Sequence, residues 1–103
     1  MKQSLKLGTH RKNRRVWLDN AEFLKKSGFK PGVSYNAFYR PITQSIELVL
    51  HPEGLRKVSK KTKAGQDVPV IDLNSTKVGW ALGKVGRIVV EYEPGFITVR
   101  GKK

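Results

Sequence analysis

The stretch from Arg14 to Gly32, RRVWLDNAEFLKKSGFKPG, constrains the fold most, because a strand end, a capped helix and a turn follow one another in it. Val16 to Leu18 is interpreted as a strand, with Val16 and Leu18 on one face and Trp17 on the other. Asp19 is expected to be the N-cap of a short helix, with Glu22 completing a capping box. Gly28 is expected to end this helix in the left-handed conformation, and the Pro-Gly pair that follows predicts a turn.

Alternating apolar residues predict strands in much of the remaining chain, over residues 3–7, 33–39, 45–50, 68–73, 88–93 and 96–100. Ser75 to Leu82 is expected to form a second short helix, with Asn74 as its N-cap and Gly83 as its end. Each half of the chain is expected to finish in a hairpin, and Pro94-Gly95 is a direct turn signal for the second one. The fold class is therefore predicted to be mainly β with short helices.

The two halves of the chain share this order of elements, which suggests an internal repeat. Val16-Trp17-Leu18 corresponds to Ile71-Asp72-Leu73, Gly32 to Gly86, and Ile46-Glu47-Leu48 to Ile97-Thr98-Val99. The alternative is a chance similarity of two β-rich halves. As a duplication, the chain is one domain, 1–103, that folds as a small swapped-hairpin-like β-barrel from two βαββ repeats. Its predicted parts are repeat one (1–50), a basic connection (51–67), repeat two (68–100) and a basic tail (101–103).

Charge is the strongest indication of function. The 103 residues include 21 Lys and Arg against 8 Asp and Glu, a formal net charge of +13, which steers a small protein toward polyanions such as nucleic acids. The absence of Cys excludes zinc ribbons, zinc fingers and thiol chemistry. No stretch has the apolar length of a signal peptide core or a membrane span, so we expect no membrane partner and a cytoplasmic location.

Two basic segments supply the candidate binding residues. Residues 10–15 cannot be core and are expected to form an exposed arm or loop between two strands, and residues 56–63 form a second basic run in the connection. Trp17 is the aromatic residue expected to be exposed, because its apolar neighbours point the other way. The alternative for each cation is a solvated position with no ligand. The predicted nucleic-acid-binding set is Lys6, His10, Arg11, Lys12, Arg14, Arg15, Trp17, Arg56, Lys57, Lys60, Lys61 and Lys63.

Catalysis has little support in the sequence. His10 and His51 have no Cys partner and no carboxylate at ligand spacing, so no metal site is predicted. Glu91 and Glu93 share a strand face, but without an attendant nucleophile or His they are interpreted as solvated side chains. No glycine-rich phosphate loop is present. We expect no cofactor and no enzymatic activity.

The segments Arg15-Val16-Trp17-Leu18 and Leu24-Lys25-Lys26-Ser27-Gly28-Phe29-Lys30-Pro31-Gly32, followed by a hairpin ending in an alternating strand, resemble the AbrB, MazE and SpoVT superfamily of swapped-hairpin barrels. They are closest to its SymE-like branch and to small domains that precede phage and bacterial cytosine methyltransferases. The resemblance covers about residues 14–50 well and residues 68–100 weakly. It implies DNA binding through basic residues at one end of the barrel, here Arg11, Lys12, Arg14 and Arg15. Asp72 stands where Trp17 stands in the first half, so the halves are not expected to contact DNA equivalently.

These observations together predict a non-enzymatic protein that binds double-stranded DNA, such as a transcriptional regulator encoded by a phage or mobile element. Two alternatives remain open. One is an RNA-directed protein, because the SymE-like branch is associated with RNA toxicity. The other is a phage-type inhibitor that binds a host nucleic-acid enzyme. The repeat allows either a monomer with two-fold pseudo-symmetry or a homodimer.

Overall fold

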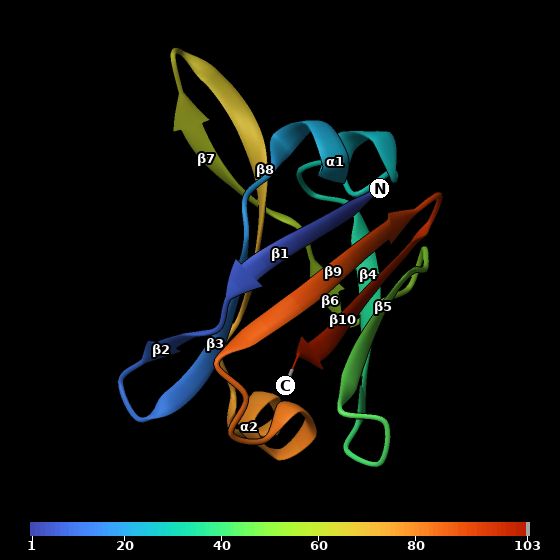
Figure 1. The fold of residues 1–103 in the computed structure, drawn as a ribbon. Helices are drawn as coiled ribbons and strands as arrows, with labels where there is room; N and C mark the ends of the chain where they lie inside the picture. Colours follow the sequence, from blue (N-terminus) through green and yellow to red (C-terminus); the bar gives the residue numbers. More distant parts are fainter. Residues whose placement is uncertain (103) are drawn as a thin grey trace.

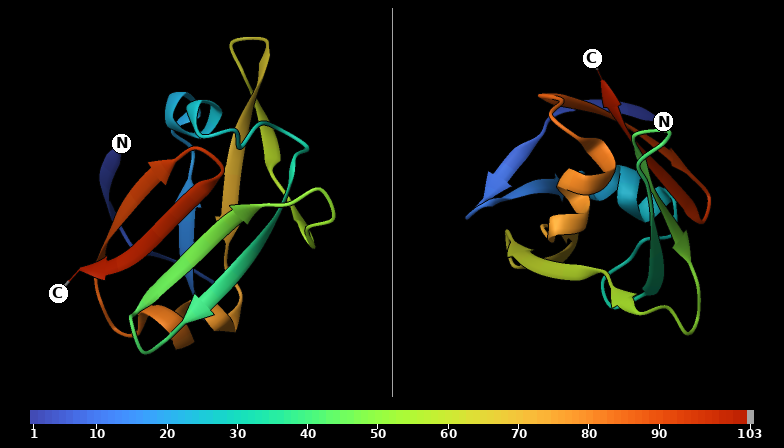
Figure 2. Two further views of the ribbon diagram at one scale, coloured as in Figure 1. Left: turned by 90° about the vertical axis from the view of Figure 1, so that its right-hand side faces the viewer. Right: turned by 90° about the horizontal axis from the view of Figure 1, so that it is seen from below.

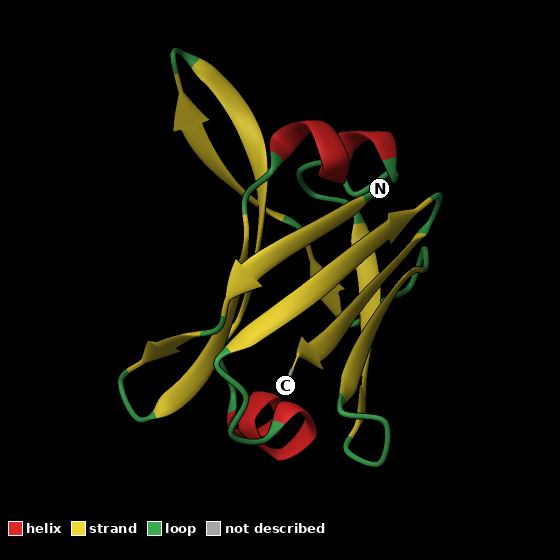
Figure 3. Ribbon diagram, viewed as in Figure 1, coloured by secondary structure: helices red, strands yellow, loops and turns green. Residues whose placement is uncertain are grey.

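The computed structural model describes residues 1–102 and confirms a mainly β fold with ten strands and two short helices (Figures 1 and 3). The helices are α1 (Ala21–Lys26) and α2 (Thr76–Leu82). The strands are β1 (Lys2–Lys6), β2 (Gly8–His10), β3 (Asn13–Leu18), β4 (Ser34–Arg40), β5 (Ser45–Leu50), β6 (Arg56–Lys57), β7 (Ser59–Lys63), β8 (Gln66–Leu73), β9 (Arg87–Glu93) and β10 (Phe96–Lys102). Lys103, the last residue of the predicted tail, lies outside the described residues.

The strands form two sheets. The larger has the order β1-β9-β10-β5-β4-β6, and the smaller has the order β2-β3-β8-β7. The chain passes from one sheet to the other at Leu7, between β1 and β2, and again at Val58, between β6 and β7. The sheets are not closed into a barrel. The two helices lie at opposite ends of the space between the sheets, with α1 beside the N-terminus and α2 at the other end (Figures 1 and 2).

The core fills the space between the sheets because β3, β4, β5, β8, β9 and β10 turn apolar residues inward. β3 and β8 supply Val16, Leu18, Ile71 and Leu73, and each of the two helices adds buried residues from one side. The larger sheet contributes the other wall of the same cluster, with Tyr35, Ile46, Leu48, Ile88, Val90, Tyr92, Ile97 and Val99.

The strand pairings are symmetric about an approximate two-fold axis. Trp17 and Asp72, which occupy corresponding positions in the aligned halves, lie directly opposite each other where β3 pairs with β8. Glu47 and Thr98, the next corresponding pair, lie opposite each other where β5 pairs with β10. If β1 to β5 are exchanged in turn with β6 to β10, each sheet has the same strand order read from its other edge.

The basic segment 10–15, expected to be an exposed arm or loop, and the basic connection 51–67 are both largely strands. The basic segment 10–15 belongs to a hairpin of β2 and β3, so the expectation of an exposed loop is wrong for Arg14 and Arg15. The connection 51–67 contains β6, β7 and the start of β8. Both segments lack an apolar face, so hydrophobic alternation could not reveal them, and pairing with a neighbouring strand stabilises them instead.

Both predicted N-caps are wrong by one residue. Asn20, not Asp19, caps α1 by accepting a hydrogen bond from the Phe23 backbone N–H, and Ser75 rather than Asn74 occupies the N-cap position of α2. The predicted helix ends are confirmed, because Gly28 and Gly83 have positive φ angles of 89° and 71°. Neither helix in the described part of the chain is long and apolar enough to cross a membrane.

Tyr92 is expected to make the stability of the protein depend on pH in the alkaline range. Its hydroxyl donates to Gln3 Oε1 at 2.8 Å, and burial raises the pKa of Tyr92 above its ordinary value. Since the folded state holds the phenol neutral, its contribution to stability is complete below pH about 10 and is lost as the pH rises further. We expect Tyr92→Phe to lose less stability than the wild type between pH about 7 and about 11, measured by urea unfolding. Equal losses in the two proteins would show that Tyr92 does not control alkaline unfolding.

Candidate nucleic-acid interface

The smaller sheet turns one face toward the core and the other outward, and the centre of this outer face is an aromatic and charged cluster. Trp17, which is 39% exposed, carries the Arg15 guanidinium 4.5 Å from its ring centroid and the Lys61 ammonium 6.0 Å from it. Both cations are held in turn by carboxylates. Arg15 donates two hydrogen bonds of 2.8 Å to Asp72, and Lys61 bonds Asp19 at 3.1 Å.

These pairings shift the pKa values of Arg15 and Asp19. The hydrogen bonds to Asp72 raise the pKa of Arg15. Burial raises the pKa of Asp19, but hydrogen bonds from Lys61 and Trp17 outweigh it, and the net pKa lies below its usual value. These interactions favour the charged forms of Arg15 and Asp19, and the mutually bonded side chains of the cluster form an ordered platform.

The β2–β3 hairpin, residues 8–15, extends from this platform and is called the first arm. Gly8 pairs with Arg15 and His10 with Asn13, so only Arg11 and Lys12 form the turn. Arg11 adopts a φ of 58°, which is uncommon for a residue with a side chain. His10, Arg11 and Lys12 are exposed, and neither cation of the turn has a carboxylate partner among the described residues.

Arg14 lies on the opposite face of the first arm from Arg15 and has a structural role. Its guanidinium donates to the backbone oxygens of Gly83, at 3.3 Å, and Val85, at 2.6 Å, at the end of α2. The Nε atom of Arg14 is buried. Arg14 is thus turned away from the outer face that carries Trp17.

The β7–β8 hairpin, residues 59–70, extends from the other end of the same sheet and is called the second arm. The two arms project in opposite directions because β3 and β8 are antiparallel (Figure 1). Lys60 bonds Asp67 at 3.3 Å, and the Thr62 hydroxyl donates to the same carboxylate. Lys63 is exposed and has no carboxylate partner in the described chain.

The remaining predicted residues lie where the chain passes between the sheets. Lys6 ends β1, and Arg56 and Lys57 form β6 at the symmetry-related position. Arg56 and Lys57 also line a polar cavity of about 280 Å³ with Tyr35, Ser59 and Asp72. Burial raises the pKa of Tyr35 against the opposing effect of Arg56. The predicted residues therefore lie on the smaller sheet with its two arms and on β1 and β6, the edge strands of the larger sheet that lead into it, with Arg14 alone turned to α2.

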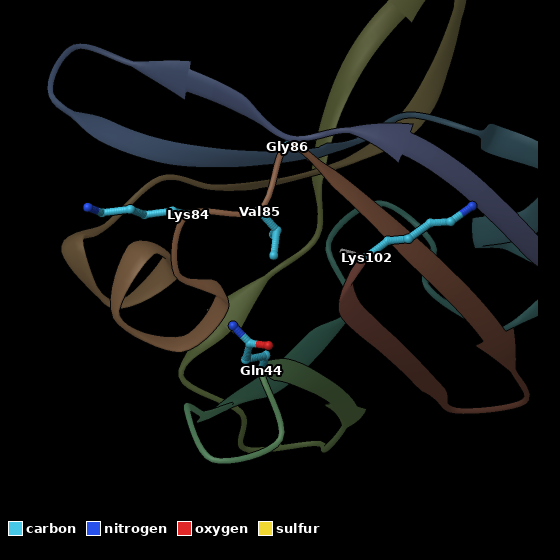
Figure 4. Close-up of a pocket in the computed structure, with 5 residues that line it drawn as sticks. All are labelled: Gln44, Lys84, Val85, Gly86 and Lys102. Carbon is cyan, nitrogen blue, oxygen red and sulfur yellow. The ribbon is translucent and has the colours of Figure 1, made fainter.

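The outer face of the larger sheet is a weaker candidate. Acidic residues lie along its middle, where Glu47 pairs with Arg40 and Glu91 bonds Lys2 at 3.3 Å. A cavity of about 420 Å³ lies near its end, lined by Gln44, Lys84, Val85, Gly86 and Lys102. Figure 4 shows that Lys84 and Lys102 point away from this cavity and away from each other. Their charges therefore do not converge on a common ligand.

Sequence reasoning missed the carboxylates that organise the platform and the polar tip of the second arm. Asp72 was noted only as the counterpart of Trp17, and Asp19 only as a cap. Gln66, which pairs with Lys63 beside the turn of the second arm, carries no charge and gave no signal. A hairpin assignment for residues 59–70 would have revealed it, and Ala64-Gly65 was its one local turn signal.

No family model, curated protein or solved structure matches this chain.

Proposed function

We propose that the protein binds double-stranded DNA, without catalysis, through the outer face of the smaller sheet and its two arms. The observation that carries this proposal is the placement of unpaired cations at both ends of one sheet, around the ordered platform of Trp17, Arg15 and Lys61. Cations without carboxylate partners can release condensed counterions from a phosphate backbone. A DNA-directed regulator with this surface would gain most of its affinity from the arms.

The dimensions and shape of the arms favour duplex DNA. A two-stranded β-ribbon fits the major groove of B-DNA, whereas the major groove of A-form RNA is too deep and narrow for side chains to read. The longest extent of the molecule is 36 Å, comparable to one turn of B-DNA, about 34–36 Å. Arms at opposite ends of one sheet therefore span at most about one turn of a duplex.

The symmetric pairings also support the proposed duplication and the proposed likeness to swapped-hairpin barrels. The first strand of each half pairs with the hairpin of the other half, since β1 pairs with β9 and β6 with β4. With β6 and β7 as counterparts of β1 and β2, the second repeat would begin near residue 55 rather than at residue 68. One chain would then supply the two halves of the DNA-binding unit.

Replacing both turn residues of the first arm tests the proposal. We expect Arg11→Ala with Lys12→Ala to weaken duplex DNA binding about 10-fold or more without changing stability, because two phosphate contacts are lost. The matched control, Arg100→Ala with Lys102→Ala, removes the same charge from the larger sheet and should bind nearly as the wild type does. Gel-shift titrations at one salt concentration measure both affinities.

The outcomes separate the alternatives. Equal losses in the two double variants would mean that net charge alone drives binding and that the smaller sheet is not the interface. A wild-type protein that prefers structured RNA to duplex DNA in a competition at matched salt would favour the RNA-directed function. A wild-type protein that binds neither would contradict the proposal altogether.

A further inference from the structure

The two arms occupy symmetry-related positions but are not alike, and this difference bears on how DNA would be read. Gly8 pairs with Arg15 as Ser59 pairs with Val70, and His10 pairs with Asn13 as Lys61 pairs with Val68. Up to this point the arms match pair for pair. Beyond it, the first arm turns at once.

The second arm is longer. It adds the pairs Thr62 with Asp67 and Lys63 with Gln66 before its turn at Ala64-Gly65. At about 3.4 Å per residue, two further pairs extend an arm by roughly 7 Å. The extension carries Lys63 and Gln66, a side-chain pair that has no counterpart in the first arm.

The arms also differ in their attachment to the body. Arg14 ties the first arm to α2 through the Gly83 and Val85 carbonyls. Beyond Lys61, which bonds Asp19, the recorded side-chain bonds of the second arm are internal to it, from Lys60 and Thr62 to Asp67. The second arm projects past α1 as a free ribbon (Figure 1).

The two arms also differ in the side chains at their tips. The first arm ends in Arg11 and Lys12, unpaired cations suited to phosphate. The second arm ends in Lys63 opposite Gln66, on the side of the ribbon that carries Lys61 and therefore faces as Trp17 does. Gln can bond adenine through two atoms, and Lys can donate to the O6 and N7 acceptors of guanine.

Building on the proposed function, we propose that the second arm reads base sequence in the major groove through Gln66 and Lys63, while the first arm binds phosphate. Phosphate contacts fix position and base contacts specify sequence. Because only one arm reads bases, a single chain would bind DNA in one orientation, and its target would be non-palindromic despite the two-fold symmetry of the fold.

In the test, the wild-type protein selects duplexes from a library with a randomised centre. The affinities of the wild type and of each variant are then measured for the selected duplex and for a scrambled one. Gln66→Ala is expected to reduce the ratio of these affinities about 10-fold or more, with an unchanged salt dependence. Asn13→Ala is the matched control, since it removes an amide side chain from the first arm and should leave the ratio unchanged. Arg11→Ala with Lys12→Ala should weaken both affinities equally. Thermal unfolding checks that each variant is folded.

Three results would overturn the inference: no sequence preference in the wild type, a preference that Gln66→Ala leaves intact, or a larger loss of preference in Asn13→Ala. A palindromic selected sequence would likewise contradict binding in one orientation. All of these require that the wild type binds duplex DNA. Absence of any duplex binding is instead the failure of the proposed function, so the two failures are distinguishable.

Discussion

Raising the salt concentration from about 50 to about 200 mM should weaken duplex DNA binding about 500-fold, the loss expected for about five phosphate contacts. Only the predicted cations that have no carboxylate partner among the described residues are counted as phosphate contacts. Arg14 is left out because it bonds the Gly83 and Val85 carbonyls. Arg15, Lys60 and Lys61 are excluded because Asp72, Asp67 and Asp19 already neutralise them. The cations counted are Arg11 and Lys12 on the first arm and Lys6, Arg56 and Lys57 on the adjoining edge strands of the larger sheet. Lys63 is left out because it is assigned to base edges.

The slope of affinity against salt tests this assignment more sharply than the affinity itself. Losing Arg11 and Lys12 should reduce the slope by about two, one for each phosphate contact. Replacing Lys60 and Asp67 together by Ala removes an existing ion pair and should change the slope little. Fluorescence titrations across a salt series measure all three proteins. An affinity that hardly changes with salt would mean that counterion release does not drive binding.

Hydrophobic alternation predicted most of the elements that build the core. The hairpins β4–β5 and β9–β10 fall close to their predicted positions because each turns one apolar face inward, and that face is visible in the sequence. The alignment of the halves also selected Trp17 and Asp72 as counterparts, and these residues are direct partners across the sheet. Where a two-fold axis passes between two antiparallel strands, each residue lies opposite its own counterpart at the axis.

The arms could not be predicted in the same way. β7 has the sequence SKKTK, and all but one of its residues are exposed, so no apolar period marks it as a strand. The N-caps failed for a different reason. Asp19 and Asn20 both have capping side chains, and local sequence does not decide between them. In the structure Asp19 bonds Lys61, distant in sequence, and Asn20 caps the helix.

Arg14→Ala should lower the stability of the protein by about 2 kcal/mol, because hydrogen bonds to charged groups contribute about 1.5–3 kcal/mol and two carbonyls lose their donor. The structural reason lies in the unequal ends of the helices. α1 has Lys25 and Lys26 in its last turn, whereas α2 has no basic residue there. A cation stabilises the C-terminal end of a helix, and Arg14 supplies it from β3.

For a domain of this size the loss corresponds to a decrease in Tm of about 8–16 °C, measurable by thermal or urea unfolding. Lys12→Ala is the control, because it removes an exposed cation two positions away and should change stability by less than about 0.5 kcal/mol. Arg14→Lys keeps the charge but loses the planar guanidinium that bonds both carbonyls. Its Tm should therefore lie between those of Arg14→Ala and Lys12→Ala. An unchanged Tm in Arg14→Ala would mean that Arg14 is not needed at the end of α2 and would return it to the candidate DNA contacts. If the Tm of Arg14→Ala falls, weaker DNA binding by Arg14→Ala is explained by displacement of the first arm. Phosphate contact is then measured directly by the loss of Arg11 and Lys12.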